Sequence, residues 1–169
     1  MALRKVKQRR GFADYLNVGT DSETYAFLGT GVTKLDESPS AQTSSKRYVS
    51  DKSLSKGITG YDDSFPFETD QIRSEEAIEF ICNIGEKRLT GTDAETDFIR
   101  VDLDKKVGAS GSEYEARKFL VAVEVADFAD SDGEMTASGN LLCIGDMVEG
   151  KFDTTAKKFT ATADAPSGS

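Results

Sequence analysis

The sequence predicts a mainly β fold of sandwich or barrel type, with one flanking α-helix at about residues 75–84. Three observations carry this prediction. Short segments with alternating apolar and polar residues recur along most of the chain, one segment repeats its apolar residues at helical spacing, and Asp132-Gly133 is a strong hairpin signal. The chain has 169 residues, the length of one domain, which we place at residues 11–161.

Two strands are predicted near the N-terminus, followed by a long loop. Residues 11–18 alternate weakly, and residues 23–28, ETYAFL, form a better strand that ends at the sequence GTG. Residues 34–46, KLDESPSAQTSSK, are rich in Ser, Thr and Lys, so we expect a polar loop between two strands. A loop of this length without structure of its own is often functional in a compact domain.

Residues 47–72 supply two or three further short strands. The pair Thr59-Gly60 predicts a bend or a bulge within them. Pro66 has no backbone N–H, so its strand is expected at a sheet edge or is locally broken.

The predicted helix comes next, from Glu75 to Ile84. Ser74 is a suitable N-cap, the acidic residues that follow suit the positive end of the helix dipole, and Gly85 is well placed to stop the helix in a left-handed conformation. One face is apolar at 3.6-residue spacing, and we interpret it as core packing. The residues of this face are Ala77, Ile78, Ile81 and Ile84.

The remaining elements are predicted strands. In TDFIRVDLD, Ile99, Val101 and Leu103 face one way while Phe98, Arg100 and Asp102 face the other. In ARKFLVAVEVADF, Phe119, Val121, Val123 and Val125 share one face. The turn at 130–134 leads into a returning strand, KKFTATA forms the last one, and residues 162–169 are a predicted disordered tail.

The charge is distributed unevenly along the chain. Residues 1–10 carry five basic residues and no acidic one, so with a net charge of −9 overall the remainder carries −14. An acidic body of this kind repels nucleic acid and anionic membranes. The basic arm at 1–10 is either mobile and solvated or ordered against the acidic surface of a neighbouring subunit. No apolar run approaches the ~18 residues of a membrane helix, and no signal peptide is recognised.

Enzymatic chemistry and cofactors are not expected. The chain has no His, which excludes Ser-His-Asp and Cys-His nucleophilic sites and most zinc sites. GTGVTK completes no nucleotide-binding fingerprint, and DFADSDGEM fails as a calcium loop because Phe128 and Gly139 would stand where oxygen donors are needed. Cys82 and Cys143 fit buried free thiols in apolar contexts, with a disulfide or a redox pair as the alternative.

The order of segments resembles one family. A strand and turn, YAFLGTGVTKLDES, precede a polar loop, then KRYVSDKSLSKGITGYDDSFPFETDQI, then SEEAIEFICNIGEKRLTGTDAETDFIRVDL. This pattern is similar to the major tail proteins (tail tube proteins) of long-tailed bacteriophages and phage-tail-like particles of Gram-positive bacteria. The resemblance covers roughly residues 15–150. It is sharpest at ITGYDDSFPFETD and the helix directly after it.

The resemblance implies a ring-forming β-sandwich whose hexameric rings stack into the tail tube, a conduit for DNA ejection into the host. The implied partners are further copies of the chain, a tape measure protein, a tail terminator and baseplate or distal tail proteins. Double-stranded DNA would pass without specific binding, and no membrane contact or cofactor is implied. The implied location is the virion tail, after assembly in the host cytoplasm.

The same resemblance gives the loop at 34–46 and the basic arm a role as bridges between subunits and rings. The acids of GYDDSFPFETD would then face the lumen or pair with Lys and Arg of the next subunit. Another tube-fold component, such as the inner tube of a contractile particle, a tail terminator or a distal tail protein, is the alternative, followed by a monomeric binding module. The candidate inter-subunit residues are Arg4, Lys5, Lys7, Arg9, Arg10, Lys34, Asp36, Glu37, Lys46, Arg47, Asp62 and Asp63.

Overall fold

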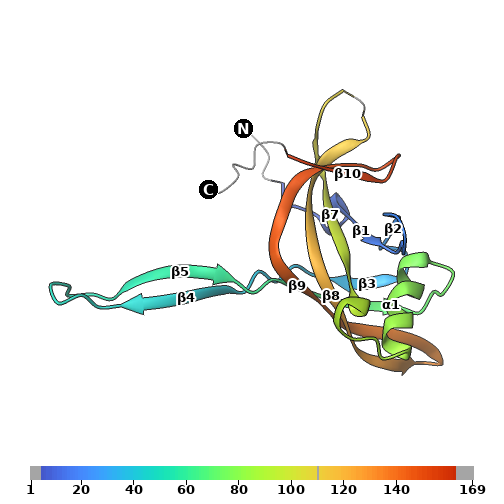
Figure 1. The fold of residues 1–169 in the computed structure, drawn as a ribbon, viewed down its shortest axis with the longest axis horizontal. Coiled ribbons are helices and arrows are strands. Elements are labelled where there is room, and N and C mark those ends of the chain that lie inside the picture. The colour runs from blue at the N-terminus through green and yellow to red at the C-terminus, as the bar shows by residue number, and fades with distance from the viewer. Residues whose placement is uncertain (1–4, 110, 163–169) are drawn as a thin grey trace.

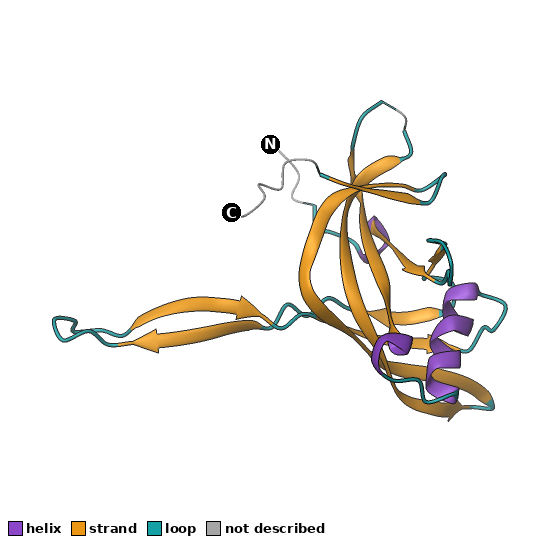
Figure 2. Ribbon diagram, viewed as in Figure 1, coloured by secondary structure: helices purple, strands orange, loops and turns teal. Residues whose placement is uncertain are grey.

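The structure, a computed structural model, describes residues 5–109 and 111–162 and is mainly β with one α-helix (Figures 1 and 2). A curled sheet forms a half-barrel, and a long two-stranded hairpin projects from it. The predicted fold class is therefore confirmed. The strands are β1 (Phe12–Asn17), β2 (Tyr25–Phe27), β3 (Val32–Leu35), β4 (Ala41–Lys46), β5 (Ser55–Tyr61), β6 (Ser64–Asp70), β7 (Glu95–Lys106), β8 (Glu113–Ser131), β9 (Glu134–Asp153) and β10 (Lys158–Ala161), and the helices are α1 (Glu76–Glu86) and the short 3-10 turns η1 (Arg9–Gly11) and η2 (Gly91–Ala94).

The half-barrel is one antiparallel sheet in the order β2-β1-β7-β8-β9-β6-β3, with β10 added beside β9. The longest strand pair of this sheet is the β8–β9 hairpin, whose strands pair along most of their length. The turn between them is the predicted one. Asp132 and Gly133 both have positive φ (53° and 89°), the conformation that a two-residue hairpin turn with the twist of the flanking strands requires.

The main hydrophobic core lies on the inner side of the curl, where α1 covers it. Phe65, Phe98 and Phe119 form an aromatic cluster there, with ring centroids 4.7 to 6.3 Å apart. A second cluster around Tyr15 and Phe152 lies on the opposite face of the same sheet. Residues 98–101 are therefore buried on both faces of β7, which is why this strand shows no simple apolar and polar alternation.

The helix runs from Glu76 to Glu86, two residues further than predicted. The N-cap is Glu75, not Ser74, and it makes no side-chain capping bond. The helix also continues through Gly85, and the left-handed residue lies later, at Arg88 (φ 54°). Gly85 serves close packing, because a Cβ there would lie 2.7 to 2.9 Å from the side chains of Phe128 and Val125. Ala77, Ile78, Ile81 and Ile84 are all buried in the main core.

The loop predicted at residues 34–46 is wrong as secondary structure. Its first residues end β3, and its last six form β4, which pairs with β5 in the projecting hairpin. Every residue of β4 is exposed, so the sequence of this strand has no apolar and polar alternation from which a strand could be predicted. The predicted bulge at Thr59-Gly60 is confirmed, because the β4–β5 register shifts between Gln42 and Thr43, opposite this pair.

Pro66 does not mark an edge strand. β6 pairs with β9 on one side and with β3 on the other, and β3 is the edge. The ladder toward β3 is nevertheless interrupted at Pro66, which accepts a hydrogen bond from the Asp36 N–H but has no N–H to return. β3 ends at Leu35, one residue before Asp36. In the described part of the chain, no helix is both long and apolar enough to cross a membrane.

Candidate assembly surface

The projecting hairpin is a direct continuation of the β3–β6 pair. Strand partners keep one register from Lys34–Glu68 and Leu35–Phe67, through the Ser38–Ser64 bridge, to Ala41–Tyr61 and Gln42–Gly60. Between these pairs, the Asp36 N–H donates to the Pro66 carbonyl and the Asp62 N–H donates to the Ser40 carbonyl. We call residues 36–62 the ribbon. It leaves the half-barrel as a single two-stranded arm that points away from the body (Figure 1).

The ribbon exposes apolar side chains that no other described residue of the chain covers. Two-stranded hairpins are marginal on their own in water, and exposed apolar groups on one favour pairing with another surface. The outer part of the ribbon is basic, because four Lys or Arg residues against Asp51 give residues 41–61 a net charge of +3 on an acidic chain, whereas Asp36, Glu37 and Asp62 at the root bring residues 36–62 as a whole to zero. The exposed large apolar residues are Tyr48, Val49, Leu54, Ile58 and Tyr61.

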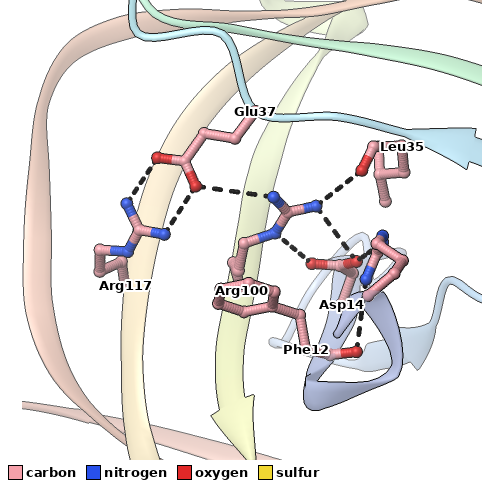
Figure 3. A network of polar contacts seen from close by, with 7 residues as sticks. Phe12, Asp14, Leu35, Glu37, Arg100 and Arg117 are labelled. Carbon is pink, nitrogen blue, oxygen red and sulfur yellow. Dashed lines mark hydrogen bonds and ion pairs between the residues drawn. The ribbon is translucent and has the colours of Figure 1, made fainter. Parts of the chain in front are cut away.

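Charged side chains form one layer inside the half-barrel (Figure 3). The layer lies beside the aromatic cluster, because the guanidinium carbon of Arg100 is 5.1 Å from the Phe65 ring centroid and that of Arg117 is 5.5 Å from the Phe119 ring centroid. Asp14, Arg100 and Arg117 each lie two residues from a core residue of their strand, so they point to the same inner side. Arg100 is 4% exposed and Asp14 is 1% exposed, and Arg100 Nε donates to Asp14 Oδ1 at 2.9 Å. Arg100 Nη2 also donates to the Leu35 carbonyl at 2.9 Å. The buried pair thus links β1, β7 and the end of β3.

Glu37, in the first residues of the ribbon, completes this layer. Both guanidinium Nη atoms of Arg117 donate to its two carboxylate oxygens at 2.7 Å, and Arg100 Nη1 lies 3.5 Å from Oε1. Hydrogen bonding from Arg117 holds the pKa of Glu37 below its ordinary value. Asp63 lies near this group, and its pKa is raised, first by burial and then by the charge of Glu37. Glu37 therefore binds within its own chain, although the sequence indicated it as an inter-subunit residue.

The basic arm also finds partners within its own chain. Lys7 forms ion pairs with Asp102 and Asp104, and these hydrogen bonds raise its pKa. Arg9 Nη2 contacts Asp14 at 2.6 Å, which adds a third cation to the buried layer. Lys5 and Arg10 are exposed, and Arg4 lies outside the described residues.

The other predicted residues lie along the ribbon and its two ends. Lys34 and Asp36 are near one another, with Nζ and Oδ2 3.9 Å apart, at the exposed edge of the sheet. Lys46 and Arg47 are exposed toward the tip, where Arg47 donates to the Lys52 carbonyl at 2.9 Å. Asp62 is exposed.

The outer face of the β6-β9-β8-β7 region is acidic. The cross-strand partners Glu124–Asn140, Asp127–Ser138 and Glu68–Ser138 show that these positions share one face, opposite to the core. None of the outward positions of this region, from β6 through the bulge of β8 to Asp97, carries Lys or Arg. The acidic residues of this face are Glu68, Asp70, Glu95, Asp97, Glu124 and Asp127.

The two Cys residues are free thiols. Cys82 is buried in α1, and Cys143 is partly buried on β9. Burial raises the pKa of Cys143 to about 12, so the thiolate that nucleophilic or metal chemistry needs is disfavoured there. Within residues 5–109 and 111–162, no three His, Cys, Asp or Glu side chains gather as a metal site would require.

Sequence reasoning missed the ionic layer and the ribbon's apolar residues. Arg100 and Arg117 occupy inward positions of their strands, two residues from the core residues Phe98 and Phe119, and the alternation did not tell which face of each strand lies in the core. A charged residue at an inward position is a usable signal, because such a group needs a buried partner. The partner of Arg117, Glu37, depends on the path of a segment that the sequence indicated as a loop.

Comparison with solved structures finds a likeness in fold. No family model matches the chain, and no curated protein matches it. Among solved structures, a chain of the anti-feeding prophage baseplate, determined by cryo-electron microscopy with six-fold symmetrisation, is similar with a TM-score of 0.49 and 12% sequence identity. The match covers 88% of this chain and 97% of that chain.

Proposed function

We propose that this chain is a self-assembling structural subunit of a phage-tail-type tube. On this proposal, subunits close into hexameric rings, rings stack, and the resulting channel conducts DNA during ejection. The order of sequence segments supports the proposal through its resemblance to major tail proteins. The observation that carries it is the ribbon, a two-stranded arm whose outer part, residues 41–61, is basic and exposes apolar side chains away from an acidic body.

The ribbon has the properties of a contact to another copy of the chain. Its exposed apolar side chains gain free energy when a surface removes them from water. The positive charge of residues 41–61 complements the negative charge that the rest of the chain carries. The unpaired edges of β2 and β3 would also gain partners if neighbouring sheets joined in a ring.

The acidic outer face of β6-β9-β8-β7 suits the wall of a DNA channel. The six carboxylates of that face outnumber the two cations at its borders, Lys34 opposite Glu68 and Lys118 next to Leu120, so the face repels phosphate groups and DNA would move past without binding. The large apolar residues Leu120, Leu142 and Ile144 beside them are partly exposed in a single chain. We place this face toward the lumen and the α1 side toward the exterior.

On this proposal the protein is not an enzyme and needs no cofactor. Its partners are other copies of itself, a tape measure protein, a tail terminator and baseplate or distal tail proteins. It would assemble in the host cytoplasm and reside in the virion tail, with no membrane contact.

Electron microscopy of the concentrated purified protein tests the proposal. We expect hollow tubes with regular cross-striations under negative stain. If only single closed rings form, a tail terminator or distal tail protein is the better assignment. A monodisperse monomer that binds a small ligand saturably would contradict assembly as the function.

A further inference from the structure

The two strands of the ribbon are attached to the half-barrel differently. The returning strand leads into β6, which pairs with β9, and the Cys143 N–H donates to the Asp63 carbonyl at the root. The outgoing strand continues β3, the edge of the sheet, so it has no strand on its outer side. Backbone pairing alone therefore leaves the outgoing strand held from one side only.

Glu37 supplies the missing attachment. From Asp36 to Asp62, it is the residue whose side chain the structure shows hydrogen-bonded to β7 or β8. The two parallel hydrogen bonds from Arg117 fix the carboxylate in one plane, which a single ion pair would not do. Arg100 approaches from the other side and is itself held by Asp14 and by the Leu35 carbonyl.

The contact between Glu37 and Arg117 is partly shielded from solvent. The side chain of Glu37 is 26% exposed and that of Arg117 is 29% exposed, so solvent screens the pair less than it screens a surface pair. Leu35 and Phe67, which face one another just before the ribbon begins, are buried. Glu37 therefore lies where the packed sheet ends and the solvent-exposed arm starts, the point at which a small rotation would move the tip furthest.

We infer that Glu37 is the positioning residue of the ribbon: its clasp by Arg117 and Arg100 fixes the direction in which the ribbon leaves the half-barrel. The consequence for assembly rests on the proposed function, whereas the effect on ribbon direction can be measured in the single chain. A ribbon held in one direction is pre-organised for a second copy, because less freedom is lost on binding.

The absence of Trp from the sequence gives a direct test. A Tyr48→Trp substitution at the exposed tip places a unique fluorophore on the ribbon of the full chain. Time-resolved anisotropy at dilution then separates tumbling of the whole molecule from nanosecond motion of the arm. In this background, we expect Glu37→Gln to add a nanosecond component that the parent lacks. Arg117→Lys, which keeps the charge but loses the paired hydrogen bonds, should add a smaller one.

Glu149→Gln is the matched control. Glu149 faces Arg117 across the β8–β9 ladder and its substitution removes the same charge, but the structure shows no bond from it to the ribbon. We expect its anisotropy decay to equal that of the parent. Circular dichroism establishes that each variant is folded before its decay is compared.

Equal decays for the parent and Glu37→Gln would overturn the inference, as would an equal change in Glu149→Gln. Tube formation by the same variants is read separately. If Glu37→Gln frees the ribbon and also slows tube growth while Glu149→Gln does neither, the positioning role extends to assembly. If the unsubstituted chain forms no tubes, the proposed function fails while the anisotropy result still decides the role of Glu37.

Discussion

The half-barrel and the ribbon are consecutive parts of one antiparallel ladder, yet they are stabilised by different interactions. In the half-barrel, strands are buried on one or both faces, and Phe65, Phe98 and Leu141 have no exposed surface. In the ribbon, every residue of β4 and nearly all of β5 is exposed. Backbone pairing is the same in both, so burial distinguishes the region that stabilises the fold from the region available for other contacts.

The largest expected effect comes from shortening the ribbon. Replacing residues 43–59 with an Asn-Gly turn between the paired residues Gln42 and Gly60 leaves Glu37, the Ser38–Ser64 bridge and the whole core in place. We expect the midpoint of thermal unfolding to stay within a few degrees of the parent and tube formation under the electron microscope to be lost. Tubes of normal length from this variant would show that the ribbon is not an assembly contact.

The second-largest expected effect is a loss in the free energy of unfolding when the core is truncated. Phe98→Ala removes a fully buried ring from the aromatic cluster and should lower the free energy of unfolding by about 3–5 kcal/mol. Ile58→Ala, at an exposed ribbon position, should change it by less than about 0.5 kcal/mol. Urea denaturation of both variants measures the contrast. Similar losses in the two would mean that the ribbon packs against the body in solution.

The ionic layer should rank just below the core. Asp14→Ala leaves Arg100 buried without its carboxylate partner, and breaking a buried pair from one side costs about 3–5 kcal/mol in other proteins. Because Arg100 keeps its bond to the Leu35 carbonyl and Glu37 lies nearby, we expect about 3 kcal/mol here. Replacing Asp14 and Arg100 together with Leu and Met should recover part of this loss in urea denaturation. No recovery would mean that the pair itself stabilises the fold.

A smaller effect is expected at Gly85. Ala is the better helix former by about 1 kcal/mol, but its Cβ would lie 2.9 Å from the Cβ of Val125 on β8. Overpacking of this kind typically costs about 1–3 kcal/mol, so Gly85→Ala should be net destabilising by about 1 kcal/mol. A stabilised variant would instead mean that Val125 and Phe128 make room for the added Cβ and that the higher helix propensity of Ala decides the outcome. Thermal and urea unfolding distinguish the two outcomes.

Much of the half-barrel could be predicted because burial leaves a pattern in the sequence. The alternation of Phe119, Val121 and Val123 and the spacing of Ile78 and Ile81 reflect faces that pack on the core. The Asp132-Gly133 turn could be predicted because positive φ restricts the residue choice. Both signals are local, and the structure bears both out.

The ribbon could not be predicted for the same physical reason. A strand with no buried face needs no alternation, so Ala41–Lys46 has the composition of a loop. The clasp of Glu37 could not be predicted from the sequence either, because Glu37, Arg100 and Arg117 are far apart in sequence and meet only through the curl of the sheet. Gly85 shows a further limit, since a Gly near a helix end can serve either a left-handed turn or close packing.

The smallest expected effect is the pH dependence of the clasp. Arg117 hydrogen bonds lower the pKa of Glu37 from its ordinary value of 4.5, with Arg100 adding in the same direction. Glu37 therefore binds its proton less tightly in the folded state than in the unfolded chain, so its ionised form stabilises the fold. This contribution to the free energy of unfolding is present above about pH 4.5 and is lost as the pH falls through the folded pKa of Glu37. Asp63, whose pKa burial raises, works in the opposite sense, because its protonation relieves a charge that the fold disfavours.

Thermal unfolding between pH 6 and pH 3 can separate the two groups. Glu37→Gln should flatten the fall in unfolding temperature below about pH 4.5, since the group that releases its proton on folding is gone. Asp63→Asn should steepen the same fall, because the opposing group is removed and Glu37 is left against Arg117 and Arg100. If Glu37→Gln keeps the parent's slope, the carboxylate is not held by Arg117 in solution, and the ribbon then lacks the attachment that sets it apart from a freely hinged hairpin.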